Sequence, residues 1–236
     1  MPGRLAIYND KSFKDDAKDF IKNDMVVNLH ARYNIPPTIP IPALLNNGNY
    51  LYTHFGYLPS WAKSKSSMNI NARSESIYEK KTFRDSFRFK RCIIPINGFY
   101  EWKKEDKEKT PFFVSDENKD YMALAGIWDE YFDDELNMNI VTVALITCDA
   151  NEKLSEIHHR MPVVLDKKDF NTWLYSDDLK AVNSLFQIYP SQSLKLYEVT
   201  SEVNKVLFDK AICIDEVISK KEEEKEPEEL GQLSLF

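Results

Sequence analysis

Four short segments of the sequence concentrate polar side chains of the types that catalysis requires. They are residues 2–4 (PGR), 71–75 (NARSE), 98–102 (GFYEW) and 157–162 (IHHRMP). His158 can exchange a proton near neutral pH and Glu101 can accept one, so the set is suited to proton-transfer chemistry. Each segment alone is weak evidence, because a Glu between two aromatic residues can lie on a surface and a His-His pair is more often held in local hydrogen bonds.

Arginine is scarce in this chain, with seven residues against 24 Lys. A planar guanidinium can hold a phosphate or a carboxylate through two parallel hydrogen bonds, which an ammonium group cannot do. Arg4, Arg73 and Arg160 lie in the four segments. We therefore expect some of these arginines to hold an anionic ligand.

The charge of the chain is uneven. The formal net charge is −7, yet residues 61–110 hold 13 Lys or Arg against seven Asp or Glu. An acidic protein with one basic segment can bind a polyanion through a single face. The KKEDKEK run at 103–109 is better interpreted as an exposed hairpin connection with a solvated surface.

Composition limits the class of protein. The chain has 236 residues, of which 43% are hydrophobic and 13% aromatic, enough for one sizeable core. No apolar run approaches the ~20 residues of a membrane span, and the start of the chain lacks the apolar stretch of a signal peptide. Cys92, Cys148 and Cys213 are far apart and form no CxxC pair. This pattern predicts a reduced, cytoplasmic protein without disulfides and without a metal site.

The elements that must position the polar segments are mostly strands. We expect strands at 5–8, 50–57, 91–103, 111–115, 121–131, 139–148, 161–165, 194–199 and 211–214, and helices at 12–21 (with Ser12 as N-cap), 166–175 and 177–186. Strands that follow one another favour an α+β fold with a barrel-like, mainly antiparallel β core and flanking helices. Hydrophobicity falls near Ser219, so we expect one domain over residues 1–218 and a charged tail over 219–236.

In this order, the four segments resemble the SOS response-associated peptidase (SRAP) family, also called abasic-site processing proteins. The resemblance runs through residues 1–200 and includes RYN at 32–34, FGYLPSW at 55–61 and RCIIP at 91–95. It implies a single α+β domain with a DNA-binding cleft that recognises abasic sites in single-stranded DNA. We expect no cofactor.

The resemblance also implies roles for individual residues. An abasic deoxyribose opens to an aldehyde, which an amine attacks to form a Schiff base. His158 matches a histidine that moves protons during ring opening, and Glu101 matches a glutamate that takes a proton from the attacking N-terminal amine. Asn71 matches an asparagine that hydrogen-bonds the reacting group. The implied DNA contacts, through phosphates or by stacking on bases, are Arg4, Asn34, Trp61, Arg73, Trp102 and Arg160.

Residue 2 departs from the family pattern. The resemblance implies a Cys after the initiator Met, joined to the abasic aldehyde as a thiazolidine, whereas this chain has Pro2. Three interpretations stay open: Pro2 reacts through its imino nitrogen, the chain is an engineered variant, or it is a non-catalytic shield for the lesion. A peptidase that acts on its own Met1 is a further alternative.

The end of the chain predicts a protein partner. The tail closes with QLSLF, which resembles the bacterial sliding-clamp-binding pentapeptide. Leu235 and Phe236 would anchor in a hydrophobic pocket, next to Leu233, and Gln232 would supply a polar contact. We therefore expect a monomer that associates with the DNA sliding clamp and protects or processes lesions at replication forks.

Overall fold

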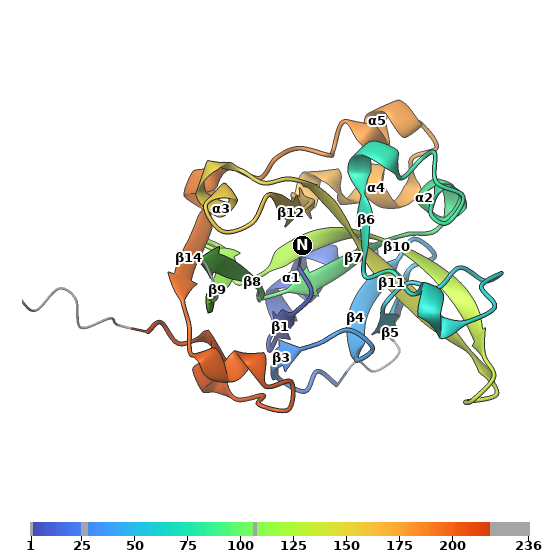
Figure 1. The fold of residues 1–236 in the computed structure, drawn as a ribbon. Helices are drawn as coiled ribbons and strands as arrows, with labels where there is room; N and C mark the ends of the chain where they lie inside the picture. The colour runs from blue at the N-terminus through green and yellow to red at the C-terminus, as the bar shows by residue number, and fades with distance from the viewer. Residues whose placement is uncertain (1, 25–27, 106–107, 218–236) are drawn as a thin grey trace, which may run out of the picture.

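The computed structural model describes residues 2–24, 28–105 and 108–217 (Figure 1). The α-helices are α1 (Lys11–Ala17), α2 (Arg84–Phe89), α3 (Glu152–Ser155), α4 (Phe170–Tyr175) and α5 (Leu179–Asn183). Short 3-10 helices span Lys65–Ser67, Ser74–Ser76, Lys167–Asp169, Ser191–Ser193, Ser201–Asn204 and Ala211–Ile214. The predicted tail and its QLSLF motif lie outside the described residues, so the boundary near Ser219 stays a prediction.

Fourteen strands are described, and they form two sheets. They are β1 (Leu5–Ile7), β2 (Asn23–Asp24), β3 (Arg32–Ile35), β4 (Pro40–Leu45), β5 (Asn49–Phe55), β6 (Asn71–Arg73), β7 (Arg91–Ile96), β8 (Gly98–Glu105), β9 (Glu108–Asp116), β10 (Met122–Asp133), β11 (Met138–Asp149), β12 (Arg160–Pro162), β13 (Val164–Leu165) and β14 (Leu194–Glu198).

The larger sheet closes on itself. Its strand order is β12-β11-β10-β7-β4-β5-β2, and β11 also pairs with β5, so β11, β10, β7, β4 and β5 form a closed circuit. Only the β5–β11 contact in that circuit is parallel. The second sheet has the order β14-β9-β8-β1-β3, and all its pairings are antiparallel. The expected α+β fold with a barrel-like, mainly antiparallel core is thus confirmed.

The predicted strand over 91–103 is wrong in one respect, because it divides at Asn97 into β7 and β8, which belong to different sheets. The buried Asn97 side chain accepts from the backbone N–H groups of Tyr8 and Asn9 and donates to the carbonyls of Asn9 and Asp120. These bonds satisfy the backbone of a neighbouring turn and hold the corner between the two sheets. Glu101, on β8, therefore lies in the five-stranded sheet.

Other boundaries also differ from the predictions. The predicted strand over 161–165 divides into β12 and β13, which pair with β11 and β10 respectively. Residues 211–214 form a 3-10 helix instead of a strand. The first helix has Asp10 rather than Ser12 as its N-cap and ends at Ala17, before the apolar residues Phe20 and Ile21. The two later helices are shorter than the expected 166–175 and 177–186.

Helices cover one end of the barrel. Figure 1 shows α2, α4 and α5 together at that end, and α4 packs on β7. Trp173 of α4 is fully buried and donates its indole N–H to the carbonyl of Cys92 at 2.8 Å. Arg91 donates to the carbonyls of Phe87 and Ser176, which fixes both helices to the start of β7. None of the described helices is long and apolar enough to cross a membrane.

Candidate active site

The first strand holds Pro2 inside the molecule. β1 lies between β3 and β8, and the backbone N–H of Tyr100 donates to the carbonyl of Arg4 at 3.0 Å. Pro2 is buried, and the side-chain amide of Asn71 donates to its carbonyl at 3.2 Å. Two of the predicted site residues, far apart in the sequence, are therefore in direct contact.

Glu101 and His158 lie together in a cleft of about 350 Å³. Oε1 of Glu101 is 3.9 Å from Nδ1 of His158. Glu101 follows Tyr100 on β8 and is only 4% exposed, whereas His158 lies between α3 and β12 and is half-buried. The rest of the lining comes from Trp102, Lys104, Lys109 and Asn204.

Burial shifts the protonation of both side chains, because each charged form loses solvation. It raises the pKa of Glu101, and it is the main reason why the pKa of His158 falls to about 4. His158 is therefore neutral at pH 7. Its Nδ1 accepts the backbone N–H of Arg160 at 3.0 Å, which assigns the ring proton to Nε2. The cleft thus combines a carboxyl group of raised proton affinity with a neutral N–H donor.

The side chain of Asn71 has one hydrogen-bond acceptor that no described residue uses. It begins β6, which runs parallel to β11 and pairs Asn71 with Leu145. Its Nδ2 is used by the carbonyl of Pro2, but its buried Oδ1 has no hydrogen-bond partner among the described residues. A buried acceptor without a donor is costly, so a ligand that supplied an N–H or O–H group would gain from this contact.

Arg160 is occupied within the protein. Its side chain is 5% exposed, and its Nη1 and Nη2 atoms bind the two carboxylate oxygens of Glu75 at 2.7 and 2.9 Å. Nη1 also contacts Asp149 at 2.7 Å, and Nη2 donates to the carbonyl of Thr147 at 2.6 Å. The guanidinium of Arg160 does form a bidentate contact, but its partner is a carboxylate of this chain. The predicted phosphate contact of Arg160 stays a prediction without support from this geometry.

Arg4 and Asn34 also make internal contacts. Nη1 of Arg4 donates to Oδ1 of Asn34 at 2.6 Å and to the carbonyl of Val203 at 2.9 Å. Asn34 is fully buried, and its amide donates to the carbonyls of Val203, Lys205 and Phe208. Both residues therefore fasten the 201–208 segment to the five-stranded sheet. Among the predicted arginines only Arg73 is exposed, and it forms no ion pair with any residue that the structure describes.

The two predicted tryptophans lie in different places. Trp102 lines the cleft, donates its indole N–H to Asn204 at 2.7 Å and lies under the guanidinium of Arg4, 5.9 Å from the ring centroid. Trp61 is 62% exposed and is not among the residues that line the cleft. Stacking of either ring on a base stays a prediction.

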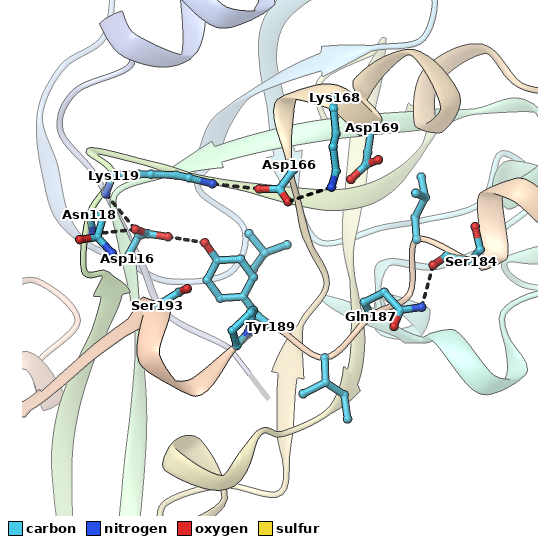
Figure 2. Close-up of a pocket in the computed structure, with 14 residues that line it drawn as sticks. Asp116, Asn118, Lys119, Asp166, Lys168, Asp169, Ser184, Gln187, Tyr189 and Ser193 are labelled. Atoms are coloured by element: carbon cyan, nitrogen blue, oxygen red, sulfur yellow. Dashed lines mark hydrogen bonds and ion pairs between the residues drawn. The ribbon is translucent and has the colours of Figure 1, made fainter.

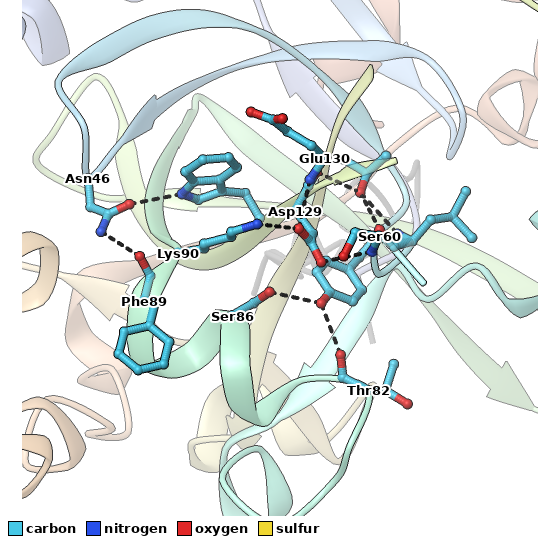
Figure 3. A network of polar contacts seen from close by, with 12 residues as sticks. Asn46, Ser60, Thr82, Ser86, Phe89, Lys90, Asp129 and Glu130 are labelled. Carbon is cyan, nitrogen blue, oxygen red and sulfur yellow. Dashed lines mark hydrogen bonds and ion pairs between the residues drawn. The ribbon is translucent and has the colours of Figure 1, made fainter. Parts of the chain in front are cut away.

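A polar network fixes the segment before Trp61. The carboxylate of Asp129 on β10 accepts the backbone N–H of Ser60 at 2.9 Å and pairs with the ammonium of Lys90 at 2.5 Å (Figure 3). The hydroxyl of Thr142 on β11 accepts the N–H of Leu58 and donates to its carbonyl, both at 3.0 Å. Residues 58–60 are therefore held against the barrel, and the exposed Trp61 directly follows this anchored segment.

Sequence reasoning missed three of the cleft residues, namely Lys104, Lys109 and Asn204. The two lysines belong to the run that the sequence indicated as a solvated hairpin connection. The pairing of β8 with β9 brings Lys104 opposite Lys109, and the expectation of a hairpin in this run could have led to this register. Asn204 ends a 3-10 helix that no pattern in the sequence predicts.

A second cleft of about 450 Å³ lies apart from these residues, between β9, α5 and the segment before β14. Figure 2 shows Tyr189 pointing at the carboxylate of Asp116, which also accepts two backbone N–H groups, from Asn118 and Lys119. Lys119 is paired with Asp166 at 2.9 Å. The charges of Asp116, Lys119 and Asp166 are thus compensated within this second cleft, and none of the predicted site residues lines it. The described residues contain no group of His, Cys, Asp and Glu that could hold a metal ion.

Comparison with known proteins gives three findings. A family model described as SOS response associated peptidase (SRAP) matches residues 1–206. The chain is 34% identical over 214 residues to the abasic site processing protein YoqW of Bacillus subtilis and 33% identical over 226 residues to YoaM of the same organism, matches that cover 86% and 91% of this chain and 94% and 98% of the relatives. A crystal structure of a Bacteroides thetaiotaomicron protein superposes with a TM-score of 0.79 at 23% identity, over 92% of this chain and all of the other.

Proposed function

The chain belongs to the SOS response associated peptidase (SRAP) family, and from this premise we propose that it captures abasic sites in single-stranded DNA through the amine of Pro2. Two hydrogen bonds carry the proposal. Asn71 donates to the carbonyl of Pro2, and the backbone N–H of Tyr100, the residue before Glu101, donates to the carbonyl of Arg4, which sets the start of the chain against β8. After removal of Met1, a secondary amine would begin the chain beside a proton acceptor and a proton donor.

The reaction begins with ring opening of the abasic deoxyribose, which moves a proton from the C1′ hydroxyl to the ring oxygen. Glu101 takes the proton of the C1′ hydroxyl and passes it to the ring oxygen, to which the Nε2–H group of the neutral His158 donates a hydrogen bond, so Glu101 ends this step as a carboxylate. The resulting C1′ aldehyde is the electrophile. Because its proton affinity is raised by burial, Glu101 is also suited to take the proton of the attacking Pro2 ammonium.

Attack forms an N–C1′ bond, and the aldehyde oxygen takes up the remaining N–H proton of Pro2 and becomes a hydroxyl. Glu101 then returns the proton that it took from the ammonium, and the hydroxyl leaves as water. The iminium that results has no N–H to lose, because the amine is secondary, and it stays cationic. It withdraws electrons from C2′, so loss of a C2′ proton can expel the 3′-phosphate and cleave the strand. Hydrolysis of the iminium returns the free amine of Pro2.

Other residues of the site bind the DNA or hold a catalytic side chain in place. Asn71 Oδ1 accepts a hydrogen bond from a hydroxyl of the sugar, and the exposed Arg73 holds a phosphate. Arg160 acts as a positioning residue, because its backbone N–H sets the tautomer of His158 while its guanidinium binds Glu75 and Asp149. Trp102 forms an aromatic wall of the cleft.

Borohydride trapping tests the proposal, because it reduces an iminium to a stable amine. The full-length protein is incubated with end-labelled single-stranded DNA that contains one abasic site, with and without borohydride, and the products are separated under denaturing conditions. We expect a protein–DNA band only with borohydride and strand cleavage without it. Noncovalent retention of the DNA, with neither product, would overturn the proposed chemistry.

Noncovalent retention of the DNA without either product would identify a non-catalytic shield for the lesion. One observation favours this alternative. Pro2 is buried, and its carbonyl is already held by Asn71. A buried terminus that keeps Met1 could bind the lesion without reacting with it. Mass spectrometry of the purified chain distinguishes the two cases, since a reactive protein must have Pro as its first residue.

A further inference from the structure

Two lysines face each other on the hairpin beside the cleft. In the β8–β9 ladder Lys104 is directly opposite Lys109, and both line the cleft that contains Glu101 and His158. Like charges directly opposite on neighbouring strands destabilise the pair. The arrangement therefore costs free energy in the unbound protein, and it needs a compensating anion.

The chain itself does not supply that anion among the described residues. The neighbouring Lys103 is paired with Glu105, with 2.7 Å between Nζ and Oε1, whereas neither Lys104 nor Lys109 forms an ion pair with a described residue. Both side chains are exposed. The two ammonium groups are thus available to an external ligand at the edge of the cleft.

The two exposed lysines matter because two of the arginines that were predicted to bind phosphate are engaged elsewhere. Arg160 and Arg4 donate to groups of the chain itself, so neither guanidinium is presented in the cleft. Among the residues that line the cleft, the only cationic side chains are Lys104 and Lys109. The charge of Lys104 also makes a small contribution to the lowered pKa of His158, whose main cause is burial.

We propose that Lys104 and Lys109 together bind a backbone phosphate of single-stranded DNA, next to the sugar that occupies the cleft. The identity of that sugar rests on the proposed function, but the contact itself is made to the phosphate and does not require a lesion. A strand phosphate satisfies both ammonium groups at once and relieves their repulsion. The pair thereby replaces Arg4 and Arg160 as the phosphate-binding cations of this cleft.

Salt dependence of binding tests the proposal, because each lost phosphate contact lowers the number of counterions released. The Lys104→Gln/Lys109→Gln variant and the native chain are titrated with an undamaged fluorescent oligodeoxythymidylate over a range of salt concentrations. We expect the slope of log K against log salt to shrink by about 0.7 per lysine, with a weaker affinity at low salt that approaches the native value at high salt.

Two further variants make the result specific. Lys103→Gln removes a neighbouring charge that is already paired with Glu105, and it should keep the native slope. Lys104→Arg/Lys109→Arg keeps both charges and should also keep it. An unchanged slope in the double Gln variant, or an equal loss in Lys103→Gln, overturns the proposal. Because the oligonucleotide carries no abasic site, this outcome is independent of the trapping experiment: native protein that traps abasic DNA but does not bind the undamaged strand would refute the lysine site alone.

Discussion

Nδ1 of His158 lies 3.9 Å from Oε1 of Glu101, too far for a direct hydrogen bond, and accepts the backbone N–H of Arg160 instead. The two side chains therefore share one cleft without exchanging a proton through Nδ1. In the proposed mechanism the carboxylate of Glu101 accepts the proton of the amine, and the Nε2–H group of His158 donates to the sugar. This separation of acceptor and donor leads to the first prediction.

Glu101→Gln should slow capture of the abasic aldehyde, because an amide cannot take the proton of the attacking amine. General acid–base catalysis contributes 10²–10⁴-fold, so we expect the rate of borohydride trapping to fall by about 100-fold. Noncovalent affinity for abasic DNA should change little. Glu105→Gln, on the same strand but exposed, is the matched control and should trap at the native rate. Equal rates in both variants would remove Glu101 from the chemistry.

The lowered pKa of His158 predicts a pH dependence of stability. The pKa is 6.5 for an ordinary histidine and about 4 in the folded protein, so between these values the unfolded chain binds a proton that the folded chain does not. The free energy of unfolding contributed by His158 is fully present above pH 6.5 and is lost as the pH falls towards 4. The raised pKa of Glu101 acts in the opposite direction, because its contribution is lost as the pH rises.

Urea unfolding of the native protein and of His158→Asn separates the two effects. The difference in unfolding free energy between them should grow with pH from 4 to 6.5 and then stay constant. The variant keeps Glu101 and so serves as the internal reference for its opposing effect. A difference that does not depend on pH would show that His158 titrates normally.

Arg73 and Arg160 should respond differently to replacement by Lys. Arg160→Lys loses the two parallel bonds to Glu75 and should lower the free energy of unfolding by about 2 kcal/mol, since hydrogen bonds to charged groups are worth ~1.5–3 kcal/mol. Arg73→Lys should leave stability unchanged but weaken binding of single-stranded DNA, because a bidentate contact is lost while the charge is kept. Thermal unfolding and DNA titration of both variants check this, and the reverse assignment would contradict it.

Much of the fold follows from local pattern, because alternation and strand propensity reveal β5, β9, β10 and β11 directly. The break at Asn97 does not, since apolar residues resume at Phe99 directly after Asn97 and Gly98. What ends β7 there is a buried side chain that bonds the backbone of Tyr8, Asn9 and Asp120. Such partners are distant in the sequence, and propensity carries no information about them.

The same limit applies to the site. Pro2, Asn71, Glu101 and His158 were predicted as catalytic residues from the sequence, and the fold brings Pro2 to Asn71 and Glu101 to His158. Residue type indicated only that some of the arginines hold an anion, and the family resemblance implied that Arg160 contacts DNA. Neither could tell that the anion at Arg160 is Glu75, because a carboxylate of the chain and a phosphate of a ligand make the same demand on a guanidinium.

The tail prediction concerns residues 219–236, which end in QLSLF. Changing Leu235 and Phe236 to Ala should abolish binding of the bacterial sliding clamp, because both hydrophobic anchors are removed. Trapping of abasic DNA should be unaffected, since a tether acts through effective concentration and not through the active site. Leu230→Ala, outside the pentapeptide, is the control. Capture of the clamp by the double variant at the native level would refute the motif.

The last prediction is that the adduct forms at the nitrogen of Pro2. Proteolysis of the borohydride-trapped complex followed by mass spectrometry should locate the added sugar on the peptide that begins with Pro2, and an adduct on a lysine would contradict this. One Ala inserted before Pro2 converts the imino nitrogen to an amide, so trapping should stop while noncovalent DNA binding persists. Pro2→Cys supplies a 1,2-aminothiol, which closes on the aldehyde to a ring without an iminium. That variant should form a cross-link that needs no borohydride, and it thereby shows that position 2 meets the lesion even if the native Pro2 proves unreactive.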